Sequence, residues 1–168
     1  EKNNLEKIIE LTPMQKGLLY HYLQDSQSEQ YFEQVSLNIT GNIDMSMFKR
    51  TWETVMESNK ILRSVFRWEK LSKPVCVILK EVLVPIIQYD FTQFDRKTSL
   101  AKLETLKQQD RKREIDISSE PFRIHLIKLT SNEFEVIMSH HHILFDGWSS
   151  GIILNEFINF YNILSENI

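Results

Sequence analysis

Apolar positions along the chain follow two spacings, one typical of β-strands and the other of α-helices. Alternating, β-branched or aromatic residues predict short strands within residues 32–39, 62–68, 75–79, 86–91, 124–129 and 134–138. Helical spacing predicts helices within residues 12–25, 44–56, 98–114 and 152–164. Helices separated by runs of strands indicate an α/β sandwich, in which helices are layered on a largely mixed sheet.

Local residues mark where several of these helices begin. Thr12-Pro13 offers a capping hydroxyl followed by proline in the first turn, and Asp44 is expected to cap the second helix. Ser149 or Ser150 is expected to cap the last helix. Residues 130–132 should turn the strand that precedes them back on itself, so that the two strands around this turn form a hairpin.

Composition limits the class of protein. Of the 168 residues 42% are hydrophobic, which suits one core and leaves no room for a second domain of ordinary size. The net charge of −3 provides no basic field for a phosphate backbone, so we expect no nucleic-acid partner. The apolar runs are far shorter than the ~20 residues of a membrane helix, so we expect no membrane association. Cys76 is the only cysteine, which excludes an internal disulfide and favours the cytoplasm.

Candidate chemistry concentrates in residues 139–151, SHHHILFDGWSSG, where a predicted strand leads through a turn into a predicted helix. Side chains alternate across a strand, so His140 and His142 should share one face while His141 points to the other. Asp146 and Gly147 should occupy the turn, where aspartate bonds nearby backbone and glycine lets a ligand approach closely. One imidazole can then face a cleft beside the unpaired amides of a helix N-terminus.

Three stretches together resemble the condensation domains of nonribosomal peptide synthetases. Residues 141–147 match the HHxxxDG signature, residues 11–20 (LTPMQKGLLY) resemble the opening motif, and residues 61–66 (ILRSVF) resemble the LRTxF strand. The resemblance implies the layered α/β sandwich of chloramphenicol acetyltransferase, as one lobe of a two-lobed domain. Residues 1–10 are expected to be a linker or the domain start, and residues 11–168 the N-terminal lobe, with the second lobe absent from this chain.

The resemblance also implies a reaction and the residues that perform it. Condensation domains form a peptide bond between a donor thioester and an acceptor amine, each tethered to the phosphopantetheine arm of a carrier protein domain. His142 is expected to act as the general base or to orient the amine, and the Gly147 N–H to donate to the developing oxyanion. His141 is expected to be structural, and Asp146 to fix the turn through an ion pair with Arg63.

Partners and substrates follow from the same resemblance. It implies donor and acceptor peptidyl carrier domains, an adjacent adenylation domain and the missing second lobe, with no metal and no directly bound cofactor. His140 stands where the family usually has an apolar residue. Residues 18–21 and 31–34 resemble the condensation domains that accept a D-configured donor.

Several other interpretations compete with this one. Residues 147–151 satisfy G-x-S-x-G, but a hydrolase with Ser149 as nucleophile would need its base histidine later in the chain, and every histidine precedes it. His140, His142 and Asp146 could together supply three zinc ligands. The histidines could also simply satisfy hydrogen bonds at the end of a sheet. A noncatalytic module that docks carrier proteins and a CoA-dependent acyltransferase are the other two alternatives.

Overall fold

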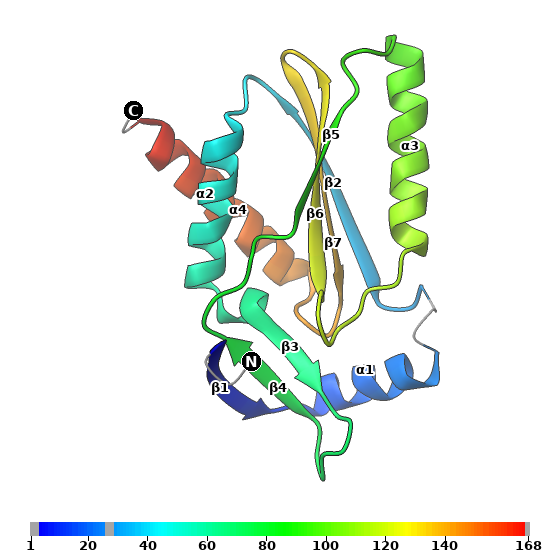
Figure 1. Ribbon diagram of the computed structural model, residues 1–168, viewed down its shortest axis with the longest axis vertical. Coiled ribbons are helices and arrows are strands. Elements are labelled where there is room, and N and C mark those ends of the chain that lie inside the picture. Colours follow the sequence, from blue (N-terminus) through cyan, green and yellow to red (C-terminus); the bar gives the residue numbers. More distant parts are fainter. Residues whose placement is uncertain (1–3, 26–28, 167–168) are drawn as a thin grey trace.

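The computed structural model describes residues 4–25 and 29–166, so the first three residues of the expected linker lie outside the described part. The chain forms two sheets and four α-helices (Figure 1). The helices are α1 (Pro13–Gln24), α2 (Met45–Ser58), α3 (Arg96–Lys112) and α4 (Gly147–Glu166). The strands are β1 (Leu5–Glu10), β2 (Phe32–Thr40), β3 (Ser64–Arg67), β4 (Val75–Leu79), β5 (Ile86–Asp90), β6 (Phe122–Thr130) and β7 (Glu133–His141).

The larger sheet is mixed and has the strand order β2-β7-β6-β5. β6 and β7 form the expected antiparallel hairpin, β2 pairs with β7 antiparallel, and β5 runs parallel to β6. Figure 1 shows α2 and α4 on one side of this sheet and α3 on the other. The layered α/β sandwich expected from the sequence is therefore confirmed, and β7 lies in the interior of the sheet with helices on both sides.

Side-chain alternation in β6 and β7 divides the interior into two cores. The larger core lies between the sheet and the helices α2 and α4, and its members include Trp52 and Phe157, whose ring centroids are 4.9 Å apart. The smaller core lies beneath α3 and consists of Leu103, Leu106, Ile127, Leu129 and Ile137. Successive residues of β7 thus face different cores, which decides the surroundings of each polar side chain near its end.

The smaller sheet has the order β1-β4-β3. β3 and β4 pair antiparallel as the sequence predicted, but the predicted strand 62–68 is shorter, because Lys60–Arg63 form a turn of 3₁₀ helix. Residues 5–10, expected to be a linker or the domain start, form β1 and pair with β4. This strand brings Glu6 beside Arg63, with consequences for the site.

The sequence signals for the first two helix starts are confirmed. Thr12 caps α1, and its hydroxyl accepts from the Gln15 N–H while the Gln15 side chain accepts from the Thr12 N–H, a reciprocal capping box. The Asp44 carboxylate accepts from the Met47 N–H at the start of α2. Within residues 4–25 and 29–166, no helix is both long enough and apolar enough to cross a membrane.

Candidate active site

The end of β7 is held by neighbouring backbone on both sides. The His141 N–H donates to the Pro121 carbonyl at 3.1 Å, and the His142 N–H donates to the Tyr31 carbonyl at 2.8 Å. The Leu144 N–H then bonds back to the His141 carbonyl at 3.0 Å and closes a turn. The strand therefore ends at His141, and His142 belongs to the turn.

His140 is completely buried on the side of the larger core. Its ring stacks on Phe145, with ring centroids 4.1 Å apart, and none of its surface is exposed. Burial lowers the pKa of His140 to about 4, so the ring is neutral at pH 7. The side chain is thus positioned as the family's apolar residue would be, packed against the turn.

His141 lies on the opposite face of β7 from His140, as strand alternation predicts. Its ring packs edge-on against Tyr22 at 5.5 Å, and its Nδ1 accepts from the Ile143 N–H at 3.0 Å. Burial, reinforced by the nearby His142, lowers the pKa of His141 to about 4. Because Nδ1 accepts a hydrogen bond, the proton of the neutral ring is on Nε2. This hydrogen bond ties the His141 ring to the turn that contains His142.

His142 lies at the wall of an open pocket of about 430 Å³, and 27% of its side chain is exposed. The strand ends at His141, so His142 is the first residue of the turn, and its ring lies beside Glu33, the residue that pairs with His140 in the ladder. Its Nδ1 is buried and makes no hydrogen bond, and the Glu33 carboxylate lies 3.7 Å away. The exposed surface of the His142 side chain therefore belongs to atoms other than Nδ1.

Asp146 caps α4, which corrects the expectation that Ser149 or Ser150 does so. The carboxylate accepts from the Ser149 N–H at 2.9 Å, and this bond lowers the pKa of Asp146. Gly147 is the first residue of α4 instead of a turn residue, at a position where the helix offers its N–H no carbonyl acceptor. The Gly147 N–H is therefore left without an acceptor inside the helix.

Arg63 does not pair with Asp146, so this expectation is wrong. Its guanidinium binds the Glu6 carboxylate at 2.7 Å, the Met56 carbonyl at 3.0 Å and the Leu79 carbonyl. Hydrogen bonds from Lys60 and Arg63 lower the pKa of Glu6 to about 2. Arg63 consequently ties β1, α2 and β4 together, while Asp146 needs no cation because backbone N–H groups satisfy it.

The pocket beside His142 is built from the residues that carried the sequence resemblance. Its walls come from the start of α1, the residues 142–146 and the start of α4. Gln15 joins two of these walls, because its side-chain N–H donates to the Ile143 carbonyl at 3.2 Å. Sequence reasoning missed Gln15, although Thr12 followed three residues later by glutamine is the pattern of a capping box.

Comparison with known proteins identifies the family. The model of the condensation domain family matches residues 5–167. The chain belongs to the condensation domain family of nonribosomal peptide synthetases. Bacitracin synthase 1 of Bacillus licheniformis is 34% identical over 158 residues, which are 94% of this chain and 3% of that protein. Tyrocidine synthase 2 of Brevibacillus parabrevis is 31% identical over 161 residues, 95% of this chain and 4% of that protein.

A solved condensation domain has the same fold. The starter condensation domain of rhizomide synthetase RzmA superposes with a TM-score of 0.87 at 18% identity, over 96% of this chain and 40% of that one. The chain therefore spans less than half of a solved condensation domain and a few per cent of the synthetases it matches. At this identity the likeness concerns the fold alone.

The described residues of this condensation domain contain no group of three or more histidine, cysteine, aspartate or glutamate side chains arranged to hold a metal ion. The zinc interpretation needed His140, His142 and Asp146 to converge. His140 instead stacks on Phe145 in the core, and Asp146 bonds to the N-terminus of α4. The three side chains therefore do not converge on one point, as the zinc interpretation required.

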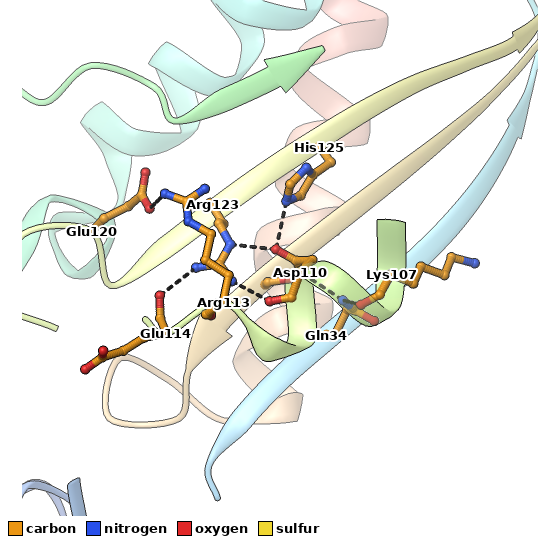
Figure 2. Close-up of polar contacts among 9 residues, drawn as sticks. Gln34, Lys107, Asp110, Arg113, Glu114, Glu120, Arg123 and His125 are labelled. Carbon is orange, nitrogen blue, oxygen red and sulfur yellow. Dashed lines mark hydrogen bonds and ion pairs between the residues drawn. The ribbon is translucent and has the colours of Figure 1, made fainter. Parts of the chain in front are cut away.

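Sequence reasoning also missed a buried polar network on the α3 side of β7. Asp110, fully buried, accepts from Arg123 Nε at 2.6 Å, from Gln34 at 2.8 Å and from the Ser139 hydroxyl, and its Oδ1 lies 2.8 Å from His125 Nε2 (Figure 2). Burial opposes ionisation, but these hydrogen bonds hold the pKa of Asp110 far below its usual range. The network fastens the end of α3 to β2, β6 and β7.

Proposed function

We propose that this chain is the N-terminal lobe of a condensation domain that forms peptide bonds between carrier-bound substrates. The observation that supports this most directly is the placement of His142 at the wall of the 430 Å³ pocket, beside the start of α4. Family membership supports the substrates: a donor thioester and an acceptor amine, each on the phosphopantetheine arm of a peptidyl carrier domain. An adenylation domain that loads the acceptor carrier would be the neighbouring partner.

The reaction needs little from the protein beyond position and charge stabilisation. The acceptor nitrogen attacks the thioester carbonyl, a C–N bond forms and the C–S bond breaks, and the departing thiolate takes up the proton that the amine loses. An α-amino group has a pKa of about 8, so roughly a tenth of it is already neutral at pH 7 and about half at pH 8, and demand for a strong base is modest. His142 either acts as a general base that takes this proton and transfers it to the thiolate, or accepts a hydrogen bond that orients the amine. Both roles require an unprotonated ring nitrogen.

The oxyanion of the tetrahedral intermediate needs a donor that is already in place. Gly147 lies at the first position of α4, and an added Cβ would meet nothing within 4 Å, so the backbone is open to a close approach. Preorganised N–H donors of this kind lower the activation free energy because they need no reorganisation as charge develops. The N-terminus of α4 also bears the positive end of the helix dipole.

The proposal includes a second lobe that closes the pocket. Two exposed apolar side chains line it, Met14 (72% exposed) and Ile152 (49%), and Trp148, next to the helix start, is 82% exposed. An apolar rim of this kind is typical of a surface that another part of a protein covers. With the pocket open to solvent, we expect the chain alone to be inactive.

The test is a condensation assay with carrier-bound donor and acceptor. The 168-residue chain is assayed alone, then with the separately produced second lobe of its domain, and then as the intact domain. We expect no dipeptidyl product from the chain alone and product from the intact domain. Turnover by the chain alone at the rate of the intact domain would contradict the need for a second lobe.

Two other outcomes would favour the alternative functions. If the intact domain forms product from acetyl-CoA and a free amine in place of carrier substrates, it is a CoA-dependent acyltransferase. If the intact domain binds the carriers but forms no product, it is a noncatalytic docking module.

A further inference from the structure

His140 and His142 both have buried ring nitrogens without a hydrogen-bond partner, but His142 is the one of the two that lines the pocket. His142 Nδ1 is buried and has no hydrogen-bond partner, although the ring borders an open pocket. Neutral imidazole has one nitrogen that donates and one that accepts, and the group beside one nitrogen decides which nitrogen bears the proton. The surroundings of Nδ1 therefore determine what the other nitrogen can do for a substrate.

The group nearest to this atom is the Glu33 carboxylate, 3.7 Å from Nδ1. Glu33 lies opposite His140 in the β2·β7 ladder, so both project toward α4. The same strand end also fixes the backbone of His142 through the Tyr31 carbonyl, at 2.8 Å. The distance from carboxylate to ring therefore depends on one short stretch of β2.

The other charged or titratable groups near the ring are already engaged or face elsewhere. Asp146 accepts from the Ser149 N–H, and His141 accepts from the Ile143 N–H through its own Nδ1. His140 is stacked on Phe145. Glu33 has no ion-pair partner besides His142 within the described ranges, and 46% of its side chain is exposed.

We propose that Glu33 is a positioning residue for His142: its carboxylate keeps the ring proton on Nδ1 and leaves Nε2 as the acceptor for the amine. A lone pair on Nδ1 would be repelled by the carboxylate, whereas an N–H is attracted to it. A separation of 3.7 Å is longer than a hydrogen bond, and such contacts commonly tighten when substrate binds. His141 and His142, adjacent in the chain, then have opposite tautomers.

This inference rests on the proposed function for its catalytic meaning, but its structural part can be tested without turnover. Ring-nitrogen NMR spectra of the ¹⁵N-labelled 168-residue chain at neutral pH distinguish the two tautomers of each histidine. His142 is assigned by comparison with His142→Ala, and His141, whose proton is on Nε2, is the internal reference. We expect the Nδ1–H form for His142, and a shift of most of the population to Nε2–H in Glu33→Ala.

Glu53→Ala is the matched control, because Glu53 is also 46% exposed and, among the described residues, its only ion pair is with a surface lysine, Lys49, at 3.8 Å. It should leave both histidine tautomers unchanged. An Nε2–H form of His142 in the parent, or no shift in Glu33→Ala, would overturn the inference even if the domain makes peptide bonds.

The kinetic arm uses the intact domain. Glu33→Ala should lower kcat about tenfold or more with little change in KM, because a ring in the wrong tautomer presents a donor to the amine. It should cause no further loss in a His142→Ala background. A tautomer shift with unchanged kcat would refute the positioning role. An intact parent domain that makes no product would contradict the proposed function and leave the tautomer result standing.

Discussion

Polar side chains near the end of β7 occur in two environments that differ in how well they are satisfied. On the α3 side, Ser139 joins the Asp110 network, in which every oxygen of the carboxylate has a partner. Beyond the strand end, His142 has a buried nitrogen with no hydrogen bond and a ring that borders a pocket. The first arrangement holds helix and sheet together, whereas the second leaves bonding capacity for a substrate.

If the proposed function holds, the contrast separates structural polarity on β7 from functional polarity just beyond its end. A buried carboxylate is tolerated only when it is paired and fully hydrogen-bonded, which describes Asp110 with Arg123. A site that reacts has to keep some groups incompletely satisfied, because the substrate supplies the missing partner. Substitutions on the α3 side should therefore change stability, and substitutions beyond the strand end should change turnover.

The largest expected effect on stability is that of Asp110→Ala. It leaves the Arg123 guanidinium, which is completely buried, without its carboxylate, at a cost of roughly 3 to 5 kcal/mol in the free energy of unfolding. The control is Glu104→Ala on the same helix, where a 66% exposed side chain pairs with Lys107 at 3.4 Å. This change should cost less than about 0.5 kcal/mol. Equal losses in urea denaturation would show that the network does not stabilise the fold.

The next largest effect comes from acid. The folded-state pKa values of His140 and His141 are about 4, below the usual 6.5, so the unfolded chain binds protons first as the pH falls. Stability is complete above pH 6.5 and decreases through the window from 6.5 to 4, by about 2 kcal/mol for each histidine at pH 5. His140→Leu should reduce this loss by about half between pH 7.5 and 5. An unchanged pH dependence in urea denaturation would contradict the burial argument.

A smaller effect is expected at the start of α4. Asp146→Ala removes a helix cap and should cost about 1 kcal/mol, whereas Asp146→Asn, which can still accept from the Ser149 N–H, should cost much less. Because Arg63 binds Glu6 instead of Asp146, the losses of Arg63→Ala and Asp146→Ala should add to within about 0.5 kcal/mol. A double-mutant cycle with a larger coupling energy would restore the ion pair that the sequence resemblance implied.

The smallest effect on stability is expected for His142→Ala. The side chain is 27% exposed and its buried nitrogen bonds to nothing, so the free energy of unfolding should change by less than about 1 kcal/mol. Thermal melts of the chain and its variant at one pH measure this directly. A loss as large as that of Asp110→Ala would place His142 among the structural residues.

The sequence predicted the helices, most strands and the α/β layering, because these follow from local spacing and caps such as Thr12 and Asp44. It missed contacts that depend on distant partners. Glu6 is 57 residues from Arg63 and lies in a segment without a clear strand pattern, so their ion pair had no local signal. Asp110, in contrast, had a local signal in the sequence, because it follows Leu103 and Leu106 at helical spacing on the buried face of α3.

The same distinction applies to the end of β7. Alternation separated His140 from His141, but nothing local to His142 shows that the strand ends at His141. Glu33 reaches the ring only because β2 pairs with β7 in one register. The surroundings of the His142 side chain thus depend on strand pairing, which spacing within a single segment does not reveal.

The role proposed for His142 is best tested by peptide bond formation in the intact domain with His142→Ala, with rate and folded fraction determined on the same preparation. We expect the variant to remain as folded as the parent and its kcat with carrier-bound donor and acceptor to fall by at least about a hundredfold. A folded His142→Ala domain that condenses its substrates at the parent rate would contradict this role.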